Sequence, residues 1–233
     1  MSLPFYVSPE QLMQDKREYA LKGISRGRSL VVLEYADGVL LAAENPSTSL
    51  SKIGEIYDRI AFAGVGRFSE FDQLRKLGIR YADVKGYSYS RDDVRARALA
   101  NSYSQAMGEV FTREMKPLEV EIVVAEVGDD KLAGHEQNAI YRVQFDGTIS
   151  DHRGYCVIGG TVENLQAYLQ TNYKAGLPLG EAVRLGVVSL ERAANGDTKI
   201  APQALEVCVL ERQRPGRKFR RLPAEELRGM LGG

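Results

Sequence analysis

The stretch Ser29–Glu44 reads SLVVLEYADGVLLAAE and carries the strongest signal for the fold. Two apolar runs flank Asp37-Gly38, and an Asp-Gly pair between such runs predicts a tight β-hairpin turn. Neither run alternates apolar with polar residues, so both faces of each predicted strand are apolar. A sheet built from such strands must be covered on both faces, by helices or by a second sheet.

Upstream of this hairpin, Ser8-Pro9-Glu10-Gln11 predicts the start of a helix over residues 9–24. Ser8 is a favourable N-cap, Pro9 suits the first helical position, and Gln11 completes a capping-box pattern. Leu12, Tyr19 and Ala20 fall on one face, which we expect to pack inward.

Downstream, a second hairpin is predicted at residues 53–57 and 60–65, and we expect both hairpins to form one four-strand antiparallel set. Further helices are predicted at 69–77, from Ser90 to just before Pro117, at 162–173, at 179–194 and near 224–230, with strands at 120–127, 139–145, 155–158 and 204–211. We expect the helix that starts at Ser90 to turn Val94, Ala98, Ala106 and Val110 inward. This order predicts an α+β fold, a four-layer α-β-β-α sandwich in a single domain over residues 9–233.

The composition excludes several classes of function. Lys plus Arg and Asp plus Glu each number 31 in 233 residues, so net charge gives no general affinity for nucleic acid or an anionic membrane. No run approaches the roughly 20 apolar residues of a membrane-spanning helix. Cys156 and Cys208 lie in apolar runs and are expected to be buried, reduced thiols, which is typical of a cytoplasmic protein.

Other chemistry-bearing patterns are weak. His135 and His152 are the only histidines, no zinc-type spacing occurs, and no G-x-S-x-G motif supports a catalytic triad, so we expect no metal and no cofactor. Gly64-x-Gly66 could bind phosphate, but a strand-to-helix turn is favoured. A basic cluster could contact nucleic acid, but a solvated turn is favoured; it comprises Arg212, Arg214, Arg217, Lys218, Arg220 and Arg221.

Two blocks carry a resemblance to a known family. GVLLAAENPSTSLSKIGEIYDRIAFAGVGRFSEFDQLR (38–75) and FDGTISDHRGYCVIGGTVENLQAYLQTNYKAGLPLGEAVRLGVVSL (145–190) resemble proteasome core subunits, and the likeness extends over about residues 8–228. Residues 1–25 and the S-x-x-K-I stretch resemble the α type in its bacterial form. The resemblance implies the sandwich of the N-terminal-nucleophile hydrolases, in agreement with the predicted layers.

The family's catalytic β subunits use an N-terminal threonine at the first strand, with an acidic residue and a lysine nearby. Aligned on the Asp-Gly turn, the nucleophile position falls on Arg28, the acidic position on Glu44 and the lysine position on Glu55. A subunit with no catalytic residues of its own, inside a threonine-type endopeptidase complex, is therefore expected. The alternative is an active N-terminal-nucleophile hydrolase that uses the hydroxyl of Ser29 after a slip in this alignment.

The resemblance also implies partners. Family α subunits form homo-oligomeric seven-membered outer rings on β rings, template assembly of the β ring, and admit unfolded protein substrates. Residues 1–8 are expected to form the gate, through Ser2, Leu3, Pro4, Phe5, Tyr6, Val7 and Ser8, although a disordered tail is the alternative. Lys52 is expected to bind the C-terminal carboxylates of a ring-shaped ATPase activator, although a solvated loop lysine is the alternative.

Overall fold

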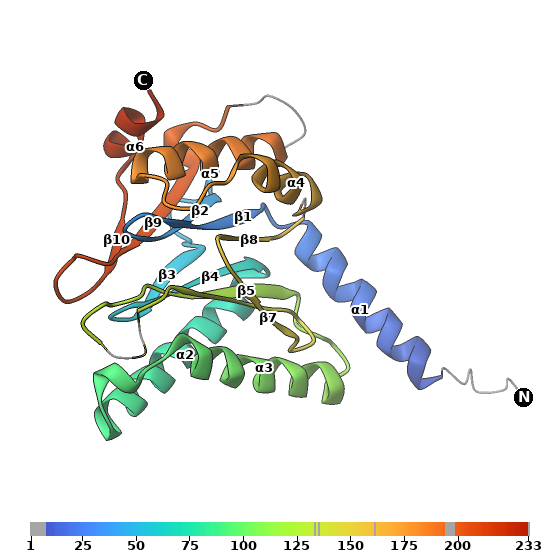
Figure 1. The fold of residues 1–233 in the computed structure, drawn as a ribbon. Helices are drawn as coiled ribbons and strands as arrows, with labels where there is room; N and C mark the ends of the chain where they lie inside the picture. The colour runs from blue at the N-terminus through green and yellow to red at the C-terminus, as the bar shows by residue number, and fades with distance from the viewer. Residues whose placement is uncertain (1–7, 133, 135, 161, 194–198, 233) are drawn as a thin grey trace, which may run out of the picture.

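The computed structural model describes residues 8–132, 134, 136–160, 162–193 and 199–232. Two five-stranded antiparallel sheets lie face to face between two layers of helices (Figure 1). The predicted four-layer α-β-β-α sandwich is therefore confirmed. Within these ranges, no helix has both the length and the apolar composition needed to cross a membrane.

The first sheet contains the hairpin that predicted the fold. Its strands follow the order β10 (Phe219–Arg221), β9 (Leu205–Glu211), β2 (Gly38–Glu44), β1 (Leu30–Tyr35) and β8 (Tyr155–Ile158). The β1–β2 register runs from Tyr35 opposite Gly38 to Leu30 opposite Ala43. The outer face of this sheet is covered by α4 (Val162–Asn172), α5 (Leu179–Ala193) and α6 (Ala224–Leu231).

The second sheet follows the order β3 (Ile53–Tyr57), β4 (Ile60–Gly66), β5 (Val120–Glu126), β6 (Ala139–Val143) and β7 (Ile149–His152). Its outer face is covered by α2 (Phe68–Ser88) and α3 (Ala96–Arg113), while short 3-10 helices lie at η1 (Arg91–Asp93) and η2 (Pro202–Ala204). The expectation that both hairpins form one four-strand set is wrong. The free edge of β2 pairs with β9 along its whole length, so β3 and β4 build the opposite sheet.

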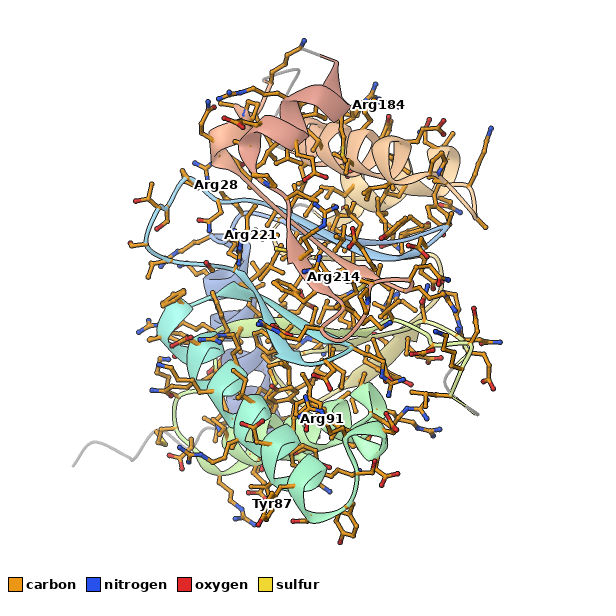
Figure 2. The ribbon with its side chains drawn as sticks, turned by 90° about the vertical axis from the view of Figure 1, so that its left-hand side faces the viewer. Arg28, Tyr87, Arg91, Arg184, Arg214 and Arg221 are labelled. Atoms are coloured by element: carbon orange, nitrogen blue, oxygen red, sulfur yellow. The ribbon has the colours of Figure 1, made fainter. Side chains whose placement is uncertain are left out.

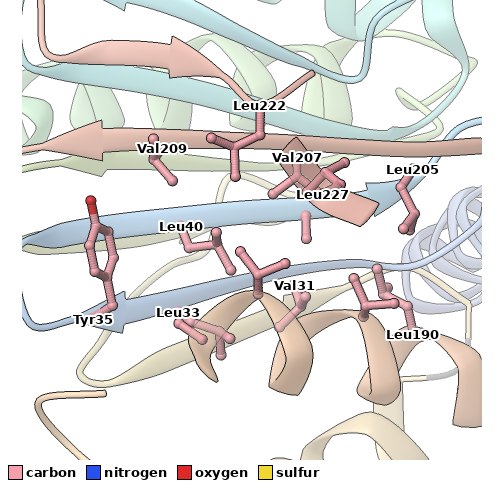
Figure 3. Packing of buried hydrophobic residues seen from close by; sticks show 14 of the residues in the cluster. Val31, Leu33, Tyr35, Leu40, Leu190, Leu205, Val207, Val209, Leu222 and Leu227 are labelled. Carbon is pink, nitrogen blue, oxygen red and sulfur yellow. The ribbon is translucent and has the colours of Figure 1, made fainter. Parts of the chain in front are cut away.

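Apolar side chains fill all three interfaces between the layers. Small and medium side chains such as Ala61, Ala63 and Val123 lie between the two sheets, where the thiols of Cys156 and Cys208 are also buried and unbonded. Figure 3 shows the packing on the outer face of the first sheet, where the side chains of strands β1, β2 and β9 meet those of α5 and α6. Each fully buried side chain of this size stabilises the fold by about 1.5–3 kcal/mol.

Helices α2 and α3 differ from their predictions. α2 continues to Ser88, well past residue 77, because Gly78 and Ala82 extend its buried face with small residues that a search for large apolar residues overlooks. A Cβ at Gly78 would lie 1.8 Å from the Tyr103 hydroxyl, so glycine makes room for that ring.

The inward face of α3 was also predicted wrongly. η1 precedes α3, and the helix itself begins only at Ala96, so its buried face consists of Ala96, Leu99, Ala100, Tyr103 and Met107. Val94, just before the helix, is buried as predicted, whereas Ala98, Ala106 and Val110 are only half-buried. Strands β7 and β10 were not predicted from the sequence, because both are short edge strands whose side chains are mostly polar and partly exposed.

Helix α1 (Pro9–Ser25) runs along the open end of the sandwich, and its first turn lies away from the body (Figure 1). The hydroxyl of Ser8 accepts a hydrogen bond from the backbone N–H of Gln11 at 3.1 Å, which confirms the predicted cap. Its buried face differs from the prediction, since Lys16, Ala20 and Ile24 are buried whereas Leu12 and Tyr19 are exposed.

Candidate functional site

The residue before the first strand of the sandwich is Arg28. Its guanidinium forms an ion pair with the carboxylate of Glu44, at the end of the neighbouring strand β2. A guanidinium is always protonated in proteins and is no nucleophile. The position that the resemblance assigned to a nucleophile therefore holds a paired cation.

Ser29, the alternative nucleophile, is buried at the start of the sheet with 7% of its surface exposed. Gly159 packs on it so closely that a Cβ at residue 159 would lie 2.8 Å from the Ser29 Cα atom. The nitrogen of Ser29 is part of a peptide bond to Arg28, behind the folded helix α1. This chain therefore presents no free amine at Ser29 that could act as a base for its hydroxyl.

A partly buried ion pair lies beside Gly159, the residue that packs on Ser29. The guanidinium of Arg142 donates to the carboxylate of Glu121 at 2.5 Å, and the backbone N–H of Gly159 donates to the other carboxylate oxygen at 3.3 Å. Burial raises the pKa of Glu121, and the charge of Arg142 opposes that rise. Burial also raises the pKa of the Cys156 thiol to about 12, which leaves it protonated and unreactive.

Lys52 ends the loop that joins the two sheets. Its ammonium donates to the backbone carbonyl of Arg28 at 2.9 Å, and its side chain is half-buried. Burial lowers the pKa of Lys52 to about 8; the nearby charge of Arg28 lowers it further, and that of Glu206 opposes both. Lys52 therefore lies beside the backbone of residue 28, at the head of β1.

The contact between Lys52 and residue 28 corrects the lysine position in the alignment with the catalytic subunits. Glu55, which counting along the chain placed at the lysine position, pairs instead with Arg217. Lys52 is the lysine that reaches residue 28. Counting residues from the Asp-Gly turn does not identify the equivalent lysine, because the loop over residues 45–52 lies between them. In the folded chain this loop brings Lys52 next to residue 28.

Glu206 organises the same loop and was not identified from the sequence. Its buried carboxylate accepts the backbone N–H groups of Lys52 at 2.9 Å and Ile53 at 3.1 Å, and the side-chain amide of Asn45 at 2.6 Å. It also forms an ion pair with Arg221 at 2.5 Å. The only available signal was an acidic residue inside the apolar run of β9, where a buried carboxylate needs partners.

The basic cluster near the C-terminus is matched by acidic residues of the same chain. Its ion pairs are Arg212–Asp130, Arg214–Glu211, Arg217–Glu55, Lys218–Asp129, Arg220–Glu226 and Arg221–Glu206. Figure 2 shows Arg28 and Arg221 in the upper half of the molecule and Tyr87 at its lower end. Because its charges are matched internally, the cluster is no free basic patch for nucleic acid.

The remaining candidate positions have structural roles or lie outside the residues that the structure describes. Gly64 and Gly66 lie at the end of β4 just before α2, and the φ of +110° at Gly66 belongs to a strand-to-helix turn. The hydroxyl of Ser150 lies 3.0 Å from Nε2 of His152. Searched over the described ranges alone, the structure holds no group of three metal-ligating side chains. His135 and residues 2–7, which were predicted to belong to a gate, lie outside the described residues.

The architecture and the head of β1 together define a class: a sandwich of the N-terminal-nucleophile type with arginine at the nucleophile position. A family model described as "Proteasome subunit" matches residues 24–210. The chain belongs to the proteasome subunit family.

Similar curated proteins carry the name "Proteasome subunit alpha". That of Kineococcus radiotolerans is 53% identical over 239 residues, which cover 100% of this chain and 99% of the relative. That of Thermomonospora curvata is 52% identical, covering 99% of this chain and 98% of the relative. That of Streptosporangium roseum is 54% identical, covering 99% and 87% respectively. The predicted resemblance to the bacterial α type is confirmed.

Proposed function

We propose that this chain is the non-catalytic α subunit of a bacterial 20S proteasome core, and that it gates protein entry and docks an ATPase ring. The observation that carries the non-catalytic part is Arg28. A paired guanidinium stands at the head of β1, behind a folded helix, where an attacking group would be required. The active-hydrolase alternative would need the buried Ser29 hydroxyl and a free amine that α1 precludes.

The proposed assembly is a homo-oligomeric heptameric outer ring stacked on a ring of β subunits, whose assembly it templates. Closed rings of this kind form through heterologous contacts that repeat by rotation. Family membership and the full-length similarity to proteins named as α subunits support it. We place the complex in the cytoplasm, consistent with two buried cysteines that form no disulfide.

Lys52 is the proposed docking residue for the activator. A primary ammonium suits a lone carboxylate such as the C-terminus of an ATPase tail. Lys52 already donates to the Arg28 carbonyl, so a carboxylate would replace a neutral acceptor with a charged one, which makes a stronger hydrogen bond. Several tails on one ring would gain through effective concentration.

Residues 1–8 are the proposed gate for unfolded protein substrates, ahead of a single domain over residues 9–233. Five of the first seven residues are apolar. Burying one such side chain contributes about 1.5–3 kcal/mol, whereas ordering the chain costs about 1–2 kcal/mol per residue. The free energy gained by burial and the cost of ordering are similar in size. An activator that binds the open state of the gate more tightly would therefore shift the population from closed to open.

Reconstitution tests this function. The purified chain is expected to hydrolyse no peptide on its own, and to support hydrolysis once assembled with its β subunit into a stacked-ring particle visible by electron microscopy. Peptide hydrolysis by the chain alone would refute the non-catalytic assignment. A chain that stays monomeric with β subunits present, by native mass spectrometry, would refute the ring assignment.

A further inference from the structure

The loop over residues 45–52 carries the proposed docking residue, Lys52, and has little apolar packing to hold it in place. Its large apolar side chain, Leu50, is 44% exposed. A loop that buries little apolar surface depends on its polar contacts for a fixed conformation. The hydrogen bonds that join this loop to the sandwich therefore decide where the side chain of Lys52 lies.

Three of these hydrogen bonds end at one carboxylate, that of Glu206 on strand β9. One of its oxygens accepts the backbone N–H of Lys52 at 2.9 Å and the side-chain amide of Asn45 at 2.6 Å. The other oxygen accepts the backbone N–H of Ile53 at 3.1 Å and the guanidinium of Arg221 at 2.5 Å. A carboxylate has about four acceptor positions, and these donors occupy all of them. Glu206 is therefore fixed itself, and it fixes both ends of the loop.

Asn45 extends the same network into the middle of the loop. Its side-chain amide also donates to the carbonyl of Leu50 at 2.7 Å, and its side-chain oxygen accepts the backbone N–H of Ser47 at 3.1 Å. The hydroxyl of Ser47 in turn accepts the backbone N–H of Leu50 at 3.0 Å. The conformation of the loop that leads to Lys52 is thus connected to Glu206.

Lys52 also lies among charges of both signs. Arg28, before β1, pairs with Glu44 of β2, and Glu206 pairs with Arg221 of β10. Burial lowers the pKa of Lys52 to about 8; the charge of Glu206 opposes this, and the charge of Arg28 adds to it. Among these neighbours, Glu206 therefore favours the ammonium form of Lys52, the form that pairs with a carboxylate.

We propose that Glu206 is the positioning residue of the docking site: its buried carboxylate holds the backbone on either side of Lys52, and its negative charge keeps a cation there for an incoming carboxylate. Glu206 is 6% exposed, so it acts through Lys52 and not by contact with the activator. Arg221 neutralises part of the charge of Glu206 and so limits its effect on Lys52. This inference rests on the docking function proposed for Lys52.

Trace acylation with acetic anhydride tests the control of Lys52 without any activator. Only the neutral amine reacts, so the labelling rate of Lys52 in the assembled core, followed by peptide mass spectrometry from pH 6 to 10, reports its titration. Glu206→Gln removes the charge and keeps the size of the side chain. We expect the midpoint of the labelling profile to move from about 8 to lower pH, by about one pH unit or more. At pH 7, Lys52 is then labelled about fivefold faster than in the wild type.

Arg221→Gln is expected to shift the profile in the opposite direction. The side chain of Arg221 is 44% exposed, so its replacement leaves no buried charge of its own behind. Without the guanidinium, the charge of Glu206 is less neutralised, and the midpoint for Lys52 should move to higher pH. A purely structural ion pair would not move the two midpoints in opposite directions.

Glu126→Gln controls for the loss of any buried carboxylate. Glu126 is 3% exposed, accepts the backbone N–H of Ala96 at 2.8 Å and pairs with Arg95 at 3.3 Å, so its surroundings resemble those of Glu206. It lies on β5, in the other sheet from Glu206. The labelling profile of Lys52 should not change in this variant.

Docking is measured on the same cores by fluorescence anisotropy with a labelled activator tail peptide. At pH 8, Glu206→Gln is expected to weaken binding about fivefold or more, because fewer Lys52 side chains are protonated. The midpoint of the pH dependence of binding should follow the labelling midpoint in every variant. Lys52→Ala measures how much of the binding depends on this lysine.

The outcomes separate this inference from the docking function. No shift of the labelling midpoint in Glu206→Gln, or an equal shift in Glu126→Gln, overturns the control of Lys52 by Glu206. If the Glu206→Gln core does not assemble, Arg221→Gln decides, and a midpoint that stays or falls overturns the inference. A shifted labelling midpoint with unchanged peptide binding overturns the role in docking. If Lys52→Ala binds the tail peptide like the wild type, the docking function fails, and the labelling profile alone still decides whether Glu206 controls Lys52.

Discussion

At the scale of single residues, Lys52 and Arg28 account for what the head of the sandwich can and cannot do. The Arg28 side chain pairs with Glu44, while its backbone carbonyl accepts the ammonium of Lys52 at 2.9 Å. Lys52 can therefore offer a cation to an anion, and the position assigned to the nucleophile holds a guanidinium, which does not attack a peptide bond. Chemistry of this kind suits recognition of a carboxylate.

We expect Lys52→Ala to reduce ATPase-driven protein degradation by about tenfold or more, since loss of a charge-assisted hydrogen bond costs about 1.5–3 kcal/mol at each bound tail. Hydrolysis of small peptides should remain nearly unchanged. Lys174→Ala, at an exposed lysine in the loop after α4, is the control. Turnover of a folded substrate by the core and its activator measures the effect, and wild-type turnover in Lys52→Ala would remove the docking assignment.

The same lysine predicts a dependence on pH. Burial lowers the pKa of Lys52 to about 8 from its ordinary value of 10.5, and only the ammonium form pairs with a carboxylate. The affinity of the assembled core for an activator tail peptide should therefore fall as pH rises through about 8. In Lys52→Arg, whose side chain stays charged, the affinity should vary little; fluorescence anisotropy between pH 7 and 9.5 measures both. A wild-type affinity independent of pH would contradict the prediction.

At Lys52, folding stability depends on pH in the opposite direction to docking affinity. Between pH 8 and 10.5 the folded chain binds fewer protons at Lys52 than the unfolded chain does, because the folded-state pKa is the lower one. At this residue, stability therefore increases with pH across that window. Weaker docking above pH 8 would thus not be explained by loss of the fold through Lys52.

At the scale of secondary-structure elements, α1 depends on a lysine, Lys16, that shares its buried face with Ala20 and Ile24. Lys16 is 6% exposed, and its ammonium donates to the C-terminal end of α3. Unpaired carbonyls at a helix end attract cations, so this bond joins two elements far apart in the sequence.

We expect Lys16→Ala to lower the free energy of unfolding by about 1–3 kcal/mol, because a carbonyl loses its charged partner and the packed stem of the side chain is removed. Lys22→Ala, at an exposed position of the same helix, should change it by less than about 0.5 kcal/mol. Denaturant unfolding at one fixed protein concentration compares the two variants. Equal midpoints for both would show that the bond contributes nothing.

The elements that the sequence predicted well are those whose signal is local. The β1–β2 hairpin follows from Asp37-Gly38 and its apolar flanks, and α1 follows from the cap at Ser8. The separation of the two hairpins into different sheets was missed, because β2 is paired by β9, which lies far along the chain.

Some residues of the candidate site could be identified from local sequence, and others required the folded structure. Arg28 and Glu44 could be identified by counting from the turn, and the structure brings them together. Glu206 could not be identified in this way, because the backbone groups that it binds lie in a loop more than 150 residues away. A single acidic residue in a strand does not indicate which groups it binds. The place of Lys52 beside residue 28 required the folded loop.

At the scale of the whole molecule, helix α1 covers the open end of the sandwich, where Arg28 also pairs with Glu44. Helix α1 leads away from the body, so its first residue, Pro9, lies apart from the two sheets (Figure 1). In the proposed ring, seven copies of the apolar segment that precedes α1 would meet one another.

We expect deletion of residues 2–7 to accelerate hydrolysis of small peptides by the assembled core several-fold, because entry would no longer require displacement of the segment. Deletion of Gly232 and Gly233, which follow the last residue of α6, is the control. Initial rates with a fluorogenic peptide measure the effect. Equal rates for the full-length and N-terminally truncated cores would count against a gate.

The claim on which the account depends is that this chain carries no nucleophile at the head of β1. Intact-mass measurement of the assembled core after treatment with a threonine-directed covalent inhibitor tests it most directly. We predict that the β subunit gains the mass of the inhibitor, while this chain stays unmodified and keeps the residues that precede Ser29. An inhibitor adduct on this chain, or a product that begins at Ser29, would contradict it.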